Sequence, residues 1–145
     1  MITEQAQGAK NVGEVMTARV VTVEMDDSLE IIRDIFRKVK FHHLFVVDNE
    51  KLVGVISDRD LLKAISPYVG TMSETTRDRA TLDKRAHQIM AHYPITIRKY
   101  CSIEEATQLM LRRGVSCLPV TNSERHIEGI VTWRDLFRAR LTSHG

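Results

Sequence analysis

The sequence predicts an α/β fold (α+β in its order of elements) built from two copies of one βαββα unit. The first observation is an internal repeat, in which a shift of 74 positions places Met16 on Met90. One extra residue within 122–126 raises the shift to 75, so that Gly54 falls on Gly129. An insertion at that point indicates a turn between two strands of each copy.

The second observation is that each copy alternates short β-branched runs with helical stripes. Helices are expected to begin near Ser28 and near Ser102, which with Glu105 has the spacing of a capping box. The closing helices are predicted at 58–65 and 134–140. The predicted strands are residues 20–23, 44–47 and 52–56 in the first copy and 95–97, 118–120 and 127–131 in the second.

Composition places the chain among ordinary globular proteins. Its 145 residues are 43% apolar and 28% charged, with only 7 glycines and 3 prolines. We expect residues 12–65 to form the first copy, 66–84 a linker with room for a short helix, and 85–141 the second copy. The polar linker is also a candidate contact surface.

Charge and hydropathy argue against several classes of protein. A formal charge of +2 gives no reason to expect binding to nucleic acid or to a membrane surface. No apolar run approaches the roughly 20 residues of a membrane span, and the first residues lack the order of a secretory signal, so we expect a cytoplasmic protein. Cys101 and Cys117 have no metal-ligand spacing and are interpreted as structural.

Both copies close with the pattern G-h-h-[ST]-x-R-D, at 54–60 and 129–135. A strand would deliver the Ser or Thr hydroxyl to a helix start, where free N–H groups can meet phosphate oxygens. The aspartate lies one turn into the helix and can accept hydrogen bonds from the hydroxyls of a ribose. The plainer alternative is that Ser57 and Thr132 cap their helices and the aspartates are ordinary first-turn residues.

This pattern, repeated behind two βαββ segments, resembles the CBS domain family, in which tandem motifs form a pseudo-twofold Bateman module packed sheet to sheet. A looser likeness is to stand-alone CBS proteins of the acetoin-utilisation accessory type. The resemblance implies ligand sites between the copies, each combining one motif with groups of the other copy. The preferred set is Thr132, Arg134, Asp135, Thr17, Thr22, Phe41 and His42; the second set is Ser57, Arg59, Asp60, Ala91, Thr96, Val115 and Ser116.

The first set is preferred because Phe41, with Trp133 nearby, suits a purine face and His42 suits a phosphate. In the second set Ala91 replaces the threonine at position 17. Arg59 and Arg134 could instead form surface ion pairs, and Trp133 could pack against another chain.

The resemblance implies a regulatory, non-catalytic module that binds AMP, ADP, ATP or a related adenosyl ligand, with no cofactor and no metal. The histidines lack the spacing of a metal site, and the sequence contains no catalytic signature. A homodimer and a separate regulated protein are the expected partners. Two alternatives stay open: a ligand-free dimerisation or interaction module, and a binder of single-stranded nucleic acid.

Overall fold

The computed structural model describes residues 10–144, which form two compact units. One unit is Val21–Pro94, and the other combines the described residues up to Val20 with those from Ile95 onward. Among the residues described, no helix has both the length and the apolar character needed to cross a membrane.

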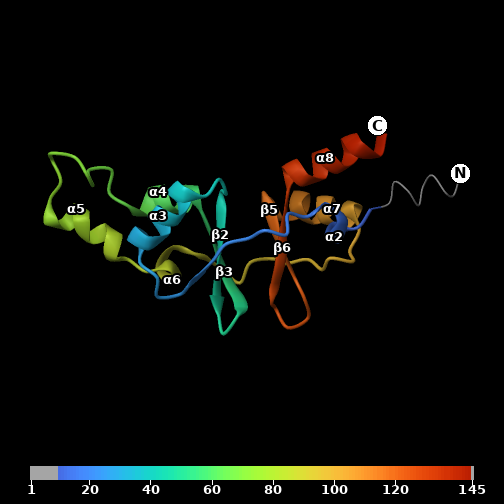
Figure 1. Cartoon of the computed structure of the whole chain (residues 1–145), viewed down its shortest axis with the longest axis horizontal. Coiled ribbons are helices and arrows are strands. Elements are labelled where there is room, and N and C mark those ends of the chain that lie inside the picture. The colour runs from blue at the N-terminus through green and yellow to red at the C-terminus, as the bar shows by residue number, and fades with distance from the viewer. Residues whose placement is uncertain (1–9, 145) are drawn as a thin grey trace, which may run out of the picture. The chain divides into compact units, whose positions relative to one another are not determined.

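The unit Val21–Pro94 contains a sheet of four strands in the order β1-β2-β3-β4. Strand β1 runs parallel to β2, and the other neighbours are antiparallel. Asn49 and Glu50 join β2 to β3 with positive φ values of 51° and 66°, as expected for a two-residue hairpin turn. Helices α3 and α4 lie side by side next to this hairpin (Figure 1). The elements are β1 (Thr22–Glu24), α3 (Leu29–Lys38), β2 (His43–Asp48), β3 (Lys51–Ser57), α4 (Asp58–Ala64) and β4 (Ala91–His92).

The segment after α4 carries three short helical elements of this unit: α5 (Thr76–Ala80), the 3-10 turn η1 (Thr81–Asp83) and α6 (Ala86–Ile89). Thr75 caps α5 and forms a capping box with Asp78. Leu82 of η1 is buried, and the backbone N–H of Ala86 donates to the carbonyl of Asp27. These contacts tie the end of the segment to the start of α3.

The other unit repeats the arrangement with shorter strands. Strands β5 and β6 form an antiparallel hairpin, Ile97 makes a parallel bridge to Val120 of β5, and Thr17 makes an antiparallel bridge to Ile130 of β6. Helix α7 ends at Gly114, whose φ of 64° is the left-handed conformation that glycine adopts without strain. The elements are α2 (Val12–Val15), α7 (Ile103–Arg113), β5 (Cys117–Thr121), β6 (Ile127–Thr132) and α8 (Trp133–His144).

Each unit has its own apolar core, made by the helix stripes and strand faces expected from the sequence. Leu29 and Ile32 of α3 are fully buried against Leu44 and Ile56 of the hairpin. In the other unit Ala106 and Met110 of α7 occupy the matching places beside Leu118 and Val131. Burial of these stripes supplies the main apolar driving force for each unit.

The predicted fold class and repeat are confirmed, with local differences. The predicted strand 95–97 is reduced to the single bridge at Ile97, because the chain around it makes no continuous ladder. Helices α2 and α6 and strand β4 were not predicted, since segments of two to four residues are too short to show periodicity.

Candidate functional site

Both motifs lie where a strand passes directly into a helix. Ser57 is the N-cap of α4: its hydroxyl accepts from the N–H of Asp60 at 3.1 Å, and the Asp60 carboxylate accepts from the N–H of Ser57 at 2.9 Å. Thr132 and Asp135 make the matching pair, with Thr132 N–H to Asp135 Oδ2 at 3.0 Å. Capping, the plainer interpretation of the motif, is therefore present in both copies and uses part of each carboxylate.

The two aspartates differ in how fully their oxygens are engaged. Asp135 is 4% exposed and accepts two further hydrogen bonds, from the Thr132 hydroxyl to Oδ2 at 3.2 Å and from the Thr17 hydroxyl to Oδ1 at 3.2 Å. A guanidinium nitrogen of Arg138 lies 3.7 Å from Oδ1. Asp60 is half-buried, and the N–H of Ser57 is its one hydrogen-bond donor among the described residues.

Thr17 and Ala91 occupy equivalent places beside the two motifs. Thr17 exchanges two backbone hydrogen bonds of 2.9 Å with Ile130, two residues before Thr132. Ala91 pairs with Val55 of β3, two residues before Ser57. The structure therefore brings the hydroxyl of Thr17, a member of the preferred residue set, onto Asp135, whereas Ala91 offers Asp60 no hydroxyl.

The glycine of each motif admits a methionine from the preceding segment. A Cβ atom on Gly54 would lie 2.3 Å from Sδ of Met90, and one on Gly129 would lie 2.7 Å from Sδ of Met16. Sequence reasoning missed this role, although the alignment of the two methionines in the repeat was a sign of it. The two glycines are therefore needed for packing of the methionines. Any contact with phosphate would be made by the residues that follow them in the motif.

His42 is engaged within its own unit. Its Nδ1 lies 2.9 Å from Asp58 Oδ2, and the backbone N–H of Asp58 donates to the His42 carbonyl. The hydrogen bond from His42 lowers the pKa of the Asp58 carboxyl. Burial lowers the pKa of the neighbouring His43, against a smaller raising effect of Asp58. The imidazole of His42 is largely exposed and joins the start of β2 to the start of α4.

The remaining predicted residues lie mostly at the surface. Arg59 and Arg134 are exposed, and neither forms an ion pair with any described residue, so the surface-pair alternative has no support in this structure. Trp133 is half-buried and stacks on Phe137, with ring centroids 6.2 Å apart. The other members are the exposed Thr22 and Ser116 and the half-buried Phe41, Thr96 and Val115.

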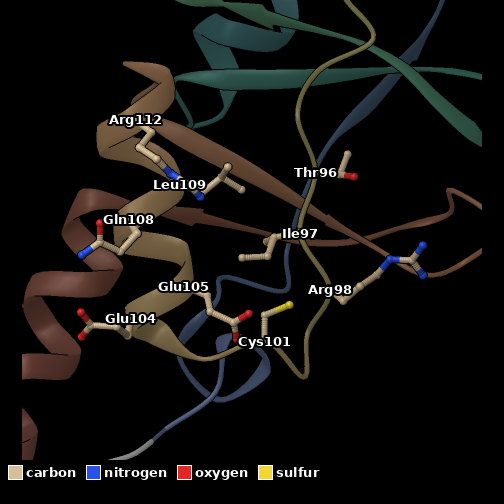
Figure 2. Close-up of a pocket in the computed structure, with 9 residues that line it drawn as sticks. All are labelled: Thr96, Ile97, Arg98, Cys101, Glu104, Glu105, Gln108, Leu109 and Arg112. Carbon is tan, nitrogen blue, oxygen red and sulfur yellow. The ribbon is translucent and has the colours of Figure 1, made fainter.

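A hollow of about 410 Å³ lies between α7 and the segment 96–98, within one unit. Figure 2 shows Ile97 and Leu109 facing each other across it, with Cys101 at one end. Thr96, a member of the second residue set, also lines it. One member of that set therefore lines the hollow, and Asp135 does not.

The cysteines and histidines form no recognisable reactive or metal site in the described part of the chain. No group of three His, Cys, Asp or Glu side chains there could hold a metal ion. Cys101 and Cys117 are both half-buried free thiols, and burial raises the pKa of Cys117 to about 11.

Two curated relatives resemble the chain over most of its length. A CBS domain-containing protein of Dictyostelium discoideum is 33% identical over 127 residues, covering 86% of this chain and 87% of the relative. Inosine-5'-monophosphate dehydrogenase of Methanocaldococcus jannaschii is 32% identical over 137 residues, 94% of this chain but only 25% of the relative. The second match therefore concerns a minor part of a larger enzyme.

Solved structures share the fold. CBSX2 in complex with AMP has a TM-score of 0.78 and 27% identity, covering 94% of this chain and 99% of that one. The CBS domain pair of MJ0100, in complex with 5'-methylthioadenosine and S-adenosyl-L-methionine, has a TM-score of 0.73 and 26% identity, covering 90% and 94%. AcuB of Vibrio cholerae shares the fold at 21% identity, with a TM-score of 0.71 and coverage of 91% and 90%.

A family model matches the chain twice, in the segments where the repeat was found. The model describes the CBS domain, and it matches residues 12–67 and 86–142. The repeat, the paired motifs and these matches agree: the chain belongs to the CBS domain family and carries a pair of CBS domains.

Proposed function

We propose that this CBS pair is a regulatory, non-catalytic sensor of an adenosine ligand: AMP, ADP, ATP or a related adenosyl compound. The observation that carries the proposal is the placement of Asp60 and Asp135 one turn after a Ser or Thr, each next to an arginine that makes no ion pair with the described residues. Carboxylate, hydroxyl and guanidinium are the groups that suit ribose hydroxyls and phosphate oxygens. The AMP, S-adenosylmethionine and methylthioadenosine held by structural neighbours support the same ligand class.

The proposed sites keep the two residue sets that the family resemblance assigns, each combining groups from both copies. The set around Asp135 is the preferred one, because Phe41 offers an aromatic face to a purine and the imidazole of His42 suits a phosphate. Binding would favour one conformation of the CBS pair. The change in conformation would alter the activity of a separate protein, or the state of the dimer itself.

The test is calorimetry with AMP, ADP, ATP and S-adenosylmethionine on the full chain. We expect micromolar to millimolar binding of at least one of them, weakened by Asp135→Asn more than by the matched Asp60→Asn. Circular dichroism of both variants checks that they are folded. No binding at millimolar concentration would refute the sensor function, and a loss at Asp60 that equals or exceeds the loss at Asp135 would refute the preferred site. Salt-sensitive binding of single-stranded RNA would replace the proposal with the nucleic-acid alternative.

A second proposal concerns self-association. Phe137 and Leu141 follow Trp133 at intervals of four residues on α8 and are 63% and 74% exposed, and Leu111 of α7 is 63% exposed. The repeat-equivalent positions on the α4 side hold Asp58, Leu62 and Ser66, so the fold does not require this apolar stripe. We propose that a second copy of the chain covers the α8 stripe in a homodimer.

Sedimentation of the purified chain tests this assembly. We expect a dimer that Phe137→Ser and Leu141→Ser weaken, while the matched control Met72→Ser, at a fully exposed linker position, leaves it unchanged. A monomeric wild type, or equal effects of the three variants, would refute the proposal. A stable dimer without any adenosine binding would favour the ligand-free interaction module.

A further inference from the structure

The carboxylate of Asp135 has all four of its acceptor positions facing a donor. Oδ2 accepts from the N–H and the hydroxyl of Thr132, and Oδ1 accepts from the hydroxyl of Thr17 with Arg138 at 3.7 Å. An ionised carboxylate offers about four lone-pair positions. A ribose that uses two of them must therefore displace donors that already belong to the chain.

Asp60 presents the opposite case in the same fold. Among the described residues it accepts one hydrogen bond, from the N–H of Ser57. The place held by Thr17 is taken by Ala91, and the place held by Arg138 is taken by Lys63, which makes no ion pair with Asp60 in the described structure. Asp60 is thus left with acceptor positions directed to solvent or to a ligand.

We infer that the Thr17 hydroxyl is a displaceable internal substitute for a ribose hydroxyl at Asp135, and that Thr17 against Ala91 makes the two carboxylates unequal. This inference rests on the proposed adenosine binding and changes one role in the preferred residue set, because Thr17 then competes with the ligand for Asp135 and does not contact the ligand itself. The backbone of Thr17 is held by its two hydrogen bonds to Ile130, so its side chain returns to the same place whenever the ligand leaves. A ligand that binds at Asp135 then replaces the hydrogen bond from Thr17 with its own. The free energy of binding is reduced by the net contribution of the Thr17 bond.

The structure also explains why the exchange has a measurable cost. Asp135 is almost fully buried, so a donor removed from it is not replaced freely by water. The net contribution of one such hydrogen bond corresponds to about a two- to tenfold change in an equilibrium constant. Removing the Thr17 hydroxyl should raise the affinity at Asp135 by that factor.

Calorimetry with AMP and with ATP in an Asp60→Asn background isolates the Asp135 site. We expect Thr17→Val, which keeps the β-branched shape, to tighten binding about two- to tenfold, and Thr17→Ser, which keeps the hydroxyl, to stay within about twofold of the parent. In an Asp135→Asn background the reciprocal Ala91→Thr should weaken binding at Asp60; Ala91 is exposed, so the larger side chain has room. Unchanged or weaker binding by Thr17→Val would overturn the inference, because Thr17 would then be a bystander or a direct ligand contact.

A ligand-free arm separates this inference from the function on which it rests. Urea unfolding of Thr17→Val, Asp135→Asn and the double variant should show coupling: the two single changes in the free energy of unfolding should not add up to the change in the double variant. Absence of coupling overturns the inference whatever the binding results are. If coupling is present but no variant binds AMP, ADP, ATP or S-adenosylmethionine, the contact stands, and both the proposed function and the displacement by a ligand are refuted.

Discussion

Met16 packs so closely on Gly129 that a Cβ atom there would lie 2.7 Å from the methionine sulfur. The repeat-equivalent pair, Met90 and Gly54, is closer still, at 2.3 Å. The surroundings of the two glycines differ in one respect: at Gly129 the carbonyl oxygen of Thr17 also lies 2.9 Å from the added atom, whereas at Gly54 the three nearest atoms all belong to Met90.

This difference predicts an unequal rescue of two alanine variants. Gly54→Ala and Gly129→Ala should each lower the free energy of unfolding by about 1–3 kcal/mol through overpacking. Met90→Ala should recover part of the loss at Gly54, because it removes most of the obstruction. Met16→Ala should recover less at Gly129, because a backbone oxygen remains in the way. Urea unfolding of the single and double variants measures this, and equal rescue would contradict the packing described.

The N-caps of α7 and α3 differ, so a Ser→Ala substitution should lower the free energy of unfolding by different amounts at the two positions. Ser102 and Glu105 cap α7 reciprocally at 3.0 and 2.9 Å, whereas Ser28 accepts one bond of 3.3 Å and Ile31 offers nothing in return. Ser102→Ala should therefore cost about 1 kcal/mol and Ser28→Ala distinctly less, as measured by urea unfolding. A larger loss at Ser28 would contradict the assignment.

The lowered pKa of His43 predicts that the free energy of unfolding declines in weak acid. Burial holds its folded-state pKa below the ordinary 6.5, with Asp58 and Asp60 opposing this effect and His42 adding to it. The unfolded chain therefore binds the proton first, so the free energy of unfolding falls as the pH drops below about 6.5, and the decline ends at the folded-state pKa. His43→Gln should flatten this part of the profile between about pH 7.5 and 5.5. An unchanged slope would refute the assignment.

The two thiols should differ in reactivity at pH 8. With its pKa raised to about 11, Cys117 is about one part in a thousand thiolate at that pH. Cys101 borders the hollow beside α7. A colorimetric disulfide reagent should titrate one thiol in the folded chain and two in urea, and Cys101→Ser should remove the first. If the thiol that reacts in the folded chain were lost in Cys117→Ser and kept in Cys101→Ser, the prediction would be wrong.

The sequence predicts most of the fold because its elements have local causes. The stripe at Leu29 and Ile32, the capping serines and the polar hairpin turns each determine structure within a few residues. The unpredicted strand β4 and the bridge at Thr17 have no such local cause. They arise from pairing with residues far along the chain, Val55 and Ile130, and two-residue segments have no measurable period.

The candidate site is less predictable than the fold for the same reason. The motif identifies Asp60 and Asp135 as equivalent, and one nearby difference is Lys63 in place of Arg138, three residues after each aspartate. The distinction comes from Thr17, which is 118 residues away from Asp135, and from Arg138. The pairing of His42 with Asp58 likewise depends on how the turn before β2 meets the start of α4.

The exchange of edge segments has a consequence for any attempt to divide the chain. Thr17, from the first repeat, bridges β6 of the second, and Ala91 and His92, from the second repeat, pair with β3 of the first. A cut at the boundary between the repeats would therefore remove β4 from the first half and the Thr17 bridge from the second. Each CBS motif therefore relies on a segment of the other to complete the edge of its sheet.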